Sequence, residues 1–438
     1  MSDKYYLGFD AGTQSVKVAV YDEDQHCLAM DTAKTHLAYP QPGWVQMDVD
    51  EYYRLIKQCM ASCSRQMEEK GWDVKNVRAI MGDGIICGIA GIDADGNAIT
   101  PYVNYLDSRT ADDVEALKAQ KLAIWGKETG NAEPNIMFPV VLDDAGGAIF
   151  SRLEHARTAE PAMFARWFMK NVPAWQEKGV KFVHNCPYVL MHLAGLKGED
   201  AFIDWGAMSG WGLGYDVVQK KWSPEQLDIL GIPERYMPRI VKPWDIIGTL
   251  CEEDAMETGF PAGIPICAGA GDTMESMMGS GILEAGRAVD VAGTCAMFCA
   301  ATDGIIPELS VSGSNLIFNS GTLPGTYFYW GMVRTGGLAL RWFKDSIARE
   351  EGDDYYGTLD ELARRHQPGC DGAMFIPYLT GGNGDYPNVR GTFTGLTLDS
   401  DQGAMWRCVL EGIGYDYMEI TDRYRKAGID LTQLTITE

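Results

Sequence analysis

Two aspartates occur in glycine-rich turns that follow apolar, strand-like runs. Asp10 stands in Gly8-Phe-Asp-Ala-Gly-Thr-Gln-Ser-Val-Lys17, and Asp272 stands in Ala268-Gly-Ala-Gly-Asp-Thr273. Glycines leave main-chain N–H groups open to an anionic ligand. A carboxylate can hold a divalent cation or accept a proton. The two runs together indicate phosphoryl transfer, with one aspartate at each edge of an active site.

The turn after Asp10 predicts a phosphate and metal site. Main-chain N–H groups and one lysine are available there for the terminal phosphates of ATP, from Gly12, Thr13, Gln14, Ser15 and Lys17. Asp10 is expected to hold Mg²⁺ through water, because Mg²⁺ sheds its water reluctantly. An ordinary hairpin turn is the alternative, and for this motif alone it has equal weight.

Asp272 is the candidate general base. It would accept the proton of a substrate hydroxyl as that oxygen attacks the γ-phosphorus of ATP. A carboxylate suffices because phosphoryl transfer has a loose transition state, so orienting the nucleophile matters more than removing its proton early. The structural alternative is an aspartate that caps a helix over residues 273–278, and one residue could do both. Gly293 and Thr294, in a second Gly-Thr turn, are expected to clamp phosphate from a second domain.

Composition excludes several classes of partner. The formal charge of −24 repels nucleic acid and anionic membranes. It is compatible with a small neutral substrate, and local amides, Lys17 and Mg²⁺ can still attract ATP. No apolar run approaches the roughly 18 to 20 residues of a membrane span, and the N-terminus lacks the pattern of a signal peptide. A cytoplasmic location is the expectation.

The elements that must position these residues follow an α/β pattern. Strand-like runs over 5–9, 16–21 and 27–30 predict an antiparallel meander around Asp10. A helix beginning at an Asp50 cap is predicted to end at Gly71, with a strand over 77–81 after it. Its apolar positions recur at helical spacing, at Tyr52, Ile56, Cys59, Met60, Cys63 and Met67.

The second half repeats this logic weakly. A strand leads into the Asp272 turn, and residues 289–299 predict a second hairpin around Gly293. A chain of 438 residues is too long for one ordinary core. We therefore expect two domains, over residues 1–248 and 249–438.

Motifs along nearly the whole chain carry a family resemblance. They include Gly43-Trp-Val-Gln-Met-Asp48, Asp107-Ser-Arg109, Gly336-Gly-Leu-Ala-Leu-Arg341 and Gly391-Thr-Phe-Thr-Gly395. The chain resembles the FGGY carbohydrate kinases, xylulose kinase-like members of the actin-like ATPase superfamily. The resemblance implies two actin-like (ribonuclease H-like) α/β domains with an active-site cleft between them, binding ATP and Mg²⁺. It places Gly337 and Arg341 near the nucleotide; the alternative is a helix over 336–347 whose Leu338, Trp342 and Ile347 serve only as core.

The resemblance also bears on the substrate. Xylulose kinases carry Gly-Gln-Met-His-Gly at the positions of Gly84–Gly88, and glycerol kinases place Arg-Glu where Ile86 and Cys87 stand here. An isoleucine and a thiol cannot replace those charged hydrogen bonds, so glycerol is disfavoured. The substrate is expected to contact Asp83, Cys87, Asn104, Tyr105, Arg109 and Asp272. For Asn104 and Arg109 a solvated loop is the equally weighted alternative.

Two departures from the family pattern stand out. Residues 131–158 look like an insertion, expected to form a lid or an oligomer contact, the latter giving a homodimer. The chain stops at a strand ending in Glu438, where the family continues with an adenosine-binding Gly-Gly loop and closing helices of on the order of 50 to 60 residues. The adenine pocket is therefore expected to be incomplete.

The leading hypothesis is an ATP-dependent kinase for a hydroxyl of a ketopentose such as xylulose, or of a related polyol. One rival is a catalytically impaired actin-like module that binds sugar or nucleotide without turnover. Intact Asp10 and Asp272 favour the enzyme, because a sensor has no chemical need for a base. The other rival is an actin-like filament or chaperone ATPase, against which the substrate-side motifs argue.

Overall fold

The computed structural model describes residues 4–118, 160–216, 219–293, 296–306, 309, 316–333, 335–349, 355–379 and 389–437. They form two compact units. The first holds the described residues up to Ser276 together with Asn319–Pro324, and the second holds the described residues of Met277–Phe318 and Gly325–Glu438. Each unit combines helices with a β-sheet, so the predicted pair of α/β domains is confirmed.

The first unit is built on a sheet with the strand order β13-β14-β5-β1-β2-β3. The predicted meander is confirmed as β1 (Tyr5–Ala11), β2 (Ser15–Asp22) and β3 (Cys27–Lys34), paired antiparallel. β5 (Val77–Gly84), the strand predicted over 77–81, runs parallel to β1. The sheet continues through β14 (Pro265–Cys267) to β13 (Ile246–Thr249).

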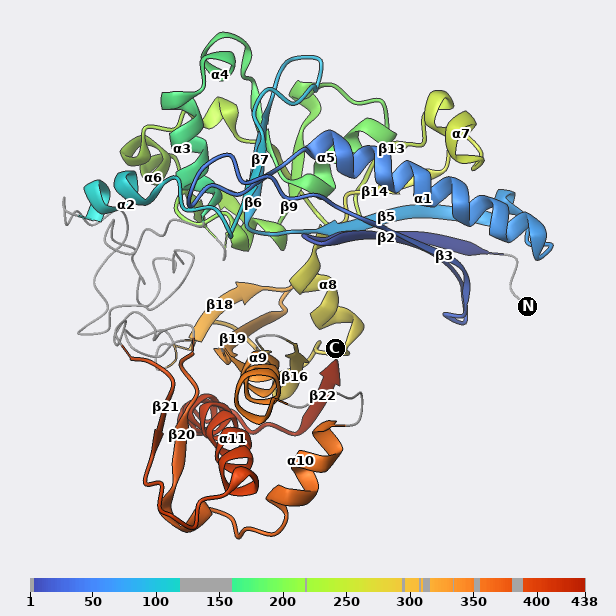
Figure 1. Ribbon diagram of the computed structural model, residues 1–438. Helices are drawn as coiled ribbons and strands as arrows, with labels where there is room; N and C mark the ends of the chain where they lie inside the picture. The colour runs from blue at the N-terminus through green and yellow to red at the C-terminus, as the bar shows by residue number, and fades with distance from the viewer. Residues whose placement is uncertain are drawn as a thin grey trace. The chain divides into compact units, whose positions relative to one another are not determined.

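Helix α1 (Val49–Glu69) packs on this sheet and lies along it in Figure 1. The six predicted core residues of the helix are all buried. The cap differs from the prediction: Asp48 is the N-cap and its carboxylate accepts from the Asp50 amide. Asp50 instead accepts a hydrogen bond from the Tyr188 hydroxyl, which occupies its side chain. In β1, Leu7, Phe9 and Ala11 belong to the core that α1 covers, so Gly8 and Asp10 alternate to the other face.

The first unit also contains several shorter strands and helices. A four-stranded sheet has the order β4-β7-β6-β8, with β4 (Gln46–Met47), β6 (Gly88–Ile92), β7 (Tyr102–Asn104) and β8 (Lys181–Val183). β9 (Phe202–Asp204) pairs with β12 (Arg239–Val241), and β10 (Tyr215–Asp216) pairs with β11 (Lys221–Trp222). The helices are α2 (Ala111–Lys118), α3 (Pro161–Asn171), α4 (Pro173–Lys178), α5 (Asn185–Leu193), α6 (Pro224–Leu230) and α7 (Glu252–Thr258).

The boundary between the units differs from the predicted one after residue 248. The first unit continues to Ser276, because β14 and the short strand β15 (Ala270–Gly271) both pair with β5. Helix α8 (Asp272–Gly279) follows β15 directly and carries the chain out of the first unit. Asp272 therefore belongs to the same unit as Asp10. Because β14 and β15 are far from β5 in the sequence, no local sequence pattern could have predicted this pairing.

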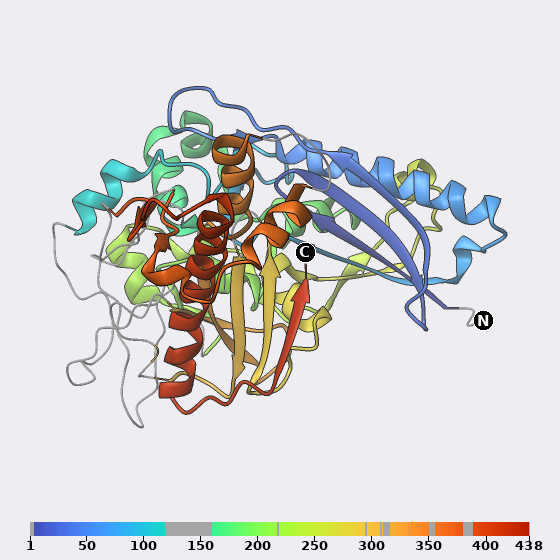
Figure 2. The ribbon, with the colours of Figure 1, turned by 60° about the horizontal axis from the view of Figure 1, so that its bottom comes forward.

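The second unit has a five-stranded sheet of order β18-β19-β17-β16-β22. Its strands are β16 (Arg287–Ala292), β17 (Ala296–Thr302), β18 (Leu316–Ser320), β19 (Tyr327–Val333) and β22 (Gln433–Thr437). The predicted hairpin around Gly293 is confirmed by the antiparallel pairing of β16 with β17. In Figure 2 the red strand β22 runs beside the gold strands of this sheet, consistent with its parallel pairing to β16.

The helices of the second unit pack around a separate apolar core. They are α9 (Gly336–Trp342), the π-helix η7 (Phe343–Ala348), α10 (Tyr355–Ala363) and α11 (Gln402–Lys426), with the hairpin β20 (Met374–Ile376) and β21 (Thr392–Thr394). Ala339 and Phe343 are the buried apolar side chains of α9–η7, whereas Ile347 is 41% exposed. Of the core face expected from Leu338, Trp342 and Ile347, Trp342 packs against this core and stacks on Phe375, as predicted. The prediction for Ile347 is wrong, because the π-helix shifts the register of the last turn. None of the helices in the described part of the chain has both the length and the apolar character to cross a bilayer.

Candidate active site

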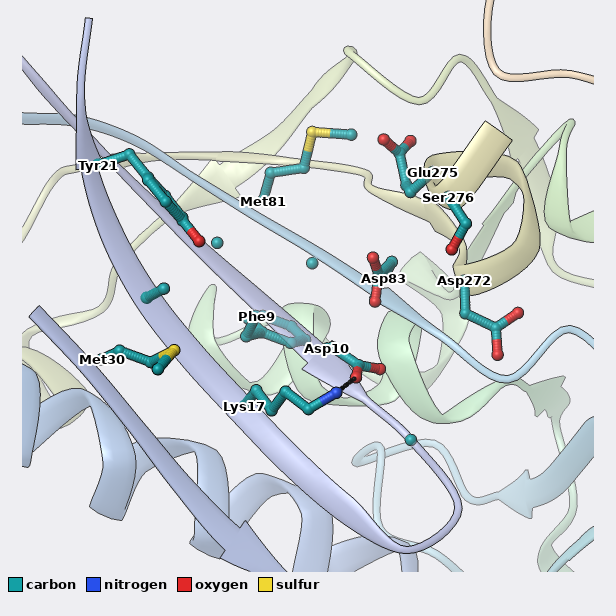
Figure 3. Close-up of a pocket in the computed structure, with 14 residues that line it drawn as sticks. Phe9, Asp10, Lys17, Tyr21, Met30, Met81, Asp83, Asp272, Glu275 and Ser276 are labelled. Atoms are coloured by element: carbon teal, nitrogen blue, oxygen red, sulfur yellow. Dashed lines mark hydrogen bonds and ion pairs between the residues drawn. The ribbon is translucent and has the colours of Figure 1, made fainter. Parts of the chain in front are cut away.

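The first unit contains a cavity of about 550 Å³ on the sheet face opposite α1. Strands β1, β2, β3 and β5 form its floor, and α8 forms one side (Figure 3). One end is charged, with Asp10, Lys17, Asp83, Asp272 and Glu275. The other end is apolar, with Tyr21, Met30 and Met81 around the small residues Gly8 and Ala19.

Strand register explains why the charged residues converge. Asp10 pairs with Lys17 on β2 and with Asp83 on β5. Asp83 in turn pairs with Ala270 on β15, two residues before Asp272. Residues paired in register point to the same face of a sheet, so three distant segments of the chain bring their aspartates to one place. The predicted convergence of Asp10 and Asp272 is therefore observed, within one unit.

Lys17 forms an ion pair with Asp10. Its Nζ lies 3.3 Å from Oδ2 of Asp10, as drawn in Figure 3, and the two side chains are 58% and 32% exposed. An exposed ion pair of this length contributes little to stability. Among the described residues that line the cavity, Lys17 has the basic side chain that could meet a phosphate.

Asp272 is a carboxylate with raised basicity. Burial raises its pKa to about 6; hydrogen bonds from the Thr273 amide (2.6 Å) and hydroxyl (3.1 Å) oppose this shift, and the charge of Asp10 adds to it. An N-cap usually accepts from an amide two or three residues on, but Asp272 accepts from the next residue and is itself the first residue of α8. The simple capping alternative therefore accounts poorly for this side chain.

Asp83 lies between the other carboxylates in Figure 3. Burial raises its pKa well above the usual range, and the charges of Asp10, Asp272 and Glu275 raise it further. Its Oδ1 is buried and has no hydrogen-bond partner among the described residues. A divalent cation would relieve both the mutual repulsion and the missing partner, and carboxylate oxygens are the ligands that Mg²⁺ prefers. The donor set thus fits the predicted Mg²⁺.

The glycine-rich turn between β1 and β2 is fixed at several points. The Gly12 amide donates to the Ser15 carbonyl (3.1 Å), and a Cβ at Gly12 would lie 3.0 Å from that oxygen. Thr35, just beyond β3, donates through its hydroxyl to the Thr13 carbonyl (2.7 Å) and through its amide to the Gln14 carbonyl (3.2 Å). These bonds occupy carbonyl groups of the turn, which suits a site that offers amides to an anion. They also occupy the Gly12 amide, so the predicted phosphate contact of that amide is wrong in this structure.

The expected substrate side begins at Ile86 and Cys87. A Cβ at Gly271 would lie 2.1 Å from Cγ2 of Ile86, so this pair packs beside the start of α8. Burial raises the pKa of the Cys87 thiol, and the charge of Asp272 adds to that shift. The structure therefore places Ile86 beside Gly271, the residue before Asp272.

Asn104 and Arg109 are buried, so the solvated-loop alternative is wrong. Arg109 donates to both carboxylate oxygens of Asp107 (2.9 and 2.8 Å) and to Oε1 of Gln46 (3.2 Å), and it lies 4.2 Å from the centre of the Trp44 ring. Oδ1 of Asn104 accepts from the Leu106 amide (3.1 Å). Both side chains therefore have structural partners.

Tyr105 differs from these two. It is 49% exposed, and its hydroxyl lies 3.3 Å from Oγ1 of Thr13. This contact links the predicted substrate wall directly to the phosphate turn.

The second unit brings together two of the predicted nucleotide residues. The Gly337 amide, at the start of α9, donates to the carbonyl of Gly293 (2.9 Å). Arg341 is exposed on the same helix. Thr294 and the expected insertion at 131–158 lie outside the described residues.

Comparison with known proteins identifies the family. Residues 5–133 and 152–279 match the N-terminal domain of the FGGY family of carbohydrate kinases, and residues 288–437 match its C-terminal domain. This chain belongs to the FGGY family of carbohydrate kinases.

The curated relatives of this FGGY kinase include a gluconokinase and a xylulose kinase. The Bacillus subtilis gluconokinase is 24% identical over 421 residues, which cover 94% of this chain and 75% of the relative. The Escherichia coli xylulose kinase is 25% identical over 438 residues, which cover 98% of this chain and 81% of the relative.

Solved structures confirm the fold class. The xylulose kinase from Rhodospirillum rubrum matches with a TM-score of 0.84 at 22% identity, covering 99% of this chain and 82% of that one. This structure and the matching gluconate and glycerol kinase structures share the two-domain actin-like ATPase fold, which is also the fold of this chain. As an FGGY kinase, the protein phosphorylates a sugar or polyol and takes the phosphoryl group from ATP.

One acidic residue of the FGGY kinase site is missing from the sequence prediction. Glu275 lines the cavity three residues after Asp272 on α8, and burial raises its pKa. The spacing itself was an available signal, because residues i and i+3 share one face of a helix.

Proposed function

We propose that this FGGY kinase phosphorylates a hydroxyl of a neutral ketopentose such as xylulose, or of a related polyol, with Asp272 as the general base. The observation that carries the proposal is the convergence of Asp10, Asp83 and Asp272 in one cavity beside a glycine-rich turn. A site of this composition offers a cation, phosphate groups and a hydroxyl their usual partners.

Asp10 would hold Mg²⁺, with Asp83 beside it. The bound cation would neutralise charge on the phosphates of ATP. Lys17, the hydroxyls of Thr13 and Ser15, and the Gln14 amide would bind the terminal phosphates, whereas the Gly12 amide donates to Ser15. Residues of the second unit would bind the nucleotide, namely Gly293, Thr294, Gly337 and Arg341.

Asp272 would take the proton of the acceptor hydroxyl. The hydroxyl oxygen forms a bond to the γ-phosphorus while the bond from that phosphorus to the β–γ bridging oxygen breaks, and ADP leaves. The proton moves to the Asp272 carboxylate. A pKa of about 6 keeps this carboxylate ionised at neutral pH and makes it a better base than an ordinary aspartate.

The charges in the cavity favour a neutral substrate. Asp83, Asp272 and Glu275 would repel the carboxylate of gluconate. Arg109 lies among the predicted substrate residues, but its Nε and Nη2 already donate to Asp107 and Gln46. Glycerol is disfavoured because Ile86 and Cys87 offer its hydroxyls no charged partner.

The test is ADP release from Mg·ATP in the presence of single candidate acceptors. The panel contains D- and L-xylulose, D- and L-ribulose, erythritol, glycerol and D-gluconate. Asp272→Asn is the test variant, and Asp399→Asn, an exposed residue of the second unit, is the matched control. We expect release with a ketopentose in the wild type and the control, and at least a hundredfold less in Asp272→Asn.

Three outcomes would change the assignment. Release with gluconate or glycerol alone would refute the choice of a neutral ketopentose. Equal release in Asp272→Asn would refute the base. Binding of ATP without release on any acceptor would favour a module that binds its ligands without turnover.

A further inference from the structure

Glu275 makes one specific contact across the first unit. Its Oε1 accepts a hydrogen bond from Oγ1 of Thr322 at 3.2 Å. Thr322 is 4% exposed, and Glu275 is itself mostly withdrawn from solvent. A bond with so little access to water is more specific in geometry than one on the surface.

Thr322 belongs to a short segment, Asn319–Pro324, that returns to the first unit between two stretches of the second. Nε1 of Trp205 donates to the Thr322 carbonyl at 2.8 Å. The Ser320 hydroxyl donates to the Trp205 carbonyl at 3.2 Å and lies 3.1 Å from the hydroxyl of Ser209. Thr322 is therefore a fixed point of the first unit.

The position of Asp272 is linked to Thr322 through helix α8. The chain before Asp272 is held by the pairing of Ala270 and Gly271 with β5. The chain after it enters α8, and Glu275 lies one helical turn along on the cavity side. Both ends of this turn, and not only the strand end, are thus tied to the first unit.

We propose that Glu275 is a positioning residue: by accepting from Thr322 it fixes the first turn of α8 and so holds the Asp272 carboxylate against the acceptor hydroxyl. The inference rests on the proposed role of Asp272 as the base. The hydrogen bond, rather than the negative charge, carries the effect. Consistent with this, the negative charge of Asp10 adds to the raised pKa of Asp272, whereas the negative charge of Glu275 adds to the raised pKa of Asp83.

A double-mutant cycle tests the bond. Steady-state kinetics with Mg·ATP and the preferred acceptor compare the wild type with Glu275→Ala, Thr322→Val and the double variant. We expect kcat to fall about tenfold in each single variant and about tenfold, not a hundredfold, in the double variant, because all three lose one interaction. KM for both substrates should stay within about twofold, since the effect is on alignment rather than binding.

Two conservative variants separate the bond from mere packing. Glu275→Gln keeps an acceptor oxygen and Thr322→Ser keeps the hydroxyl, so both should retain kcat within about twofold of the wild type. The thermal midpoint, measured for every variant, checks that the comparison is made on folded protein.

Different results would refute the positioning role of Glu275 and the proposed function. A wild-type rate in Glu275→Ala, or a low rate in Glu275→Gln, would refute the positioning bond while leaving the proposed function standing. Full additivity in the double variant would also refute it. Absence of turnover by the wild type on the whole panel would overturn the proposed function, and this inference with it.

Discussion

Asp272→Asn should make the protein more stable while it removes turnover. Burial raises the pKa of this carboxyl from its ordinary value of 3.8 to about 6 in the folded state. The ionised carboxylate is therefore less favourable in the folded protein than in the unfolded chain. Asn has nearly the same shape, carries no charge, and can still accept from Thr273 through its amide oxygen.

The magnitude follows from linkage between ionisation and folding. A raised acid pKa costs stability as pH rises from about 4 to 6, and the full cost is present above pH 6. A rise from 3.8 to about 6 corresponds to about 3 kcal/mol at pH 8 and to roughly half of that at pH 5. Asp272→Asn should thus gain on the order of 1 kcal/mol more at pH 8 than at pH 5.

Urea unfolding followed by tryptophan fluorescence, at pH 5 and pH 8, measures this difference. The wild type, Asp272→Asn and the control Asp399→Asn are compared at both pH values. We expect the unfolding midpoint of Asp272→Asn to exceed that of the wild type, with the larger excess at pH 8. Equal stability at pH 8, or a larger gain at pH 5, would refute the claim that burial destabilises the ionised Asp272 carboxylate in the folded protein.

Three further predictions concern the same site. Below about pH 6, log kcat/KM for the sugar should fall by one unit per pH unit, because protonated Asp272 cannot accept a proton; a flat profile down to pH 5 would contradict this. Lys17→Met should raise KM for ATP about tenfold through loss of one charged phosphate contact, with the thermal midpoint nearly unchanged because the side chain is 58% exposed; unchanged KM would contradict it. Arg109→Lys should lower the free energy of unfolding by about 1 to 3 kcal/mol, since a lysine cannot meet both oxygens of buried Asp107; loss of activity at full stability would instead indicate direct substrate contact.

Much of the site could be predicted from local sequence. Asp10 and Asp272 each stand where an apolar strand meets glycines, and that pattern fixes both the strand and the turn. Helix α1 formed where the apolar spacing predicted it, and only its N-cap differed, being Asp48 instead of Asp50. The buried state of Arg109 was not predicted, because its partner Gln46 lies on β4, far away in the sequence.

The remainder depended on pairing between distant segments. Asp83 meets Asp10 through the parallel register of β1 and β5. Asp272 belongs to the first unit because β14 and β15 pair with β5, and no local sequence pattern predicts that pairing. The π-helix after α9 changed which side chains are buried, and apolar spacing assumes a regular α-helix.

The most direct test of phosphoryl transfer with Asp272 as the base is ³¹P NMR of the reaction with Mg·ATP and D-xylulose. The proposed mechanism predicts a phosphate monoester of the sugar that appears in step with ADP, and neither product above background in Asp272→Asn. Inorganic phosphate in place of the ester, or ester formed at the wild-type rate by Asp272→Asn, would contradict it.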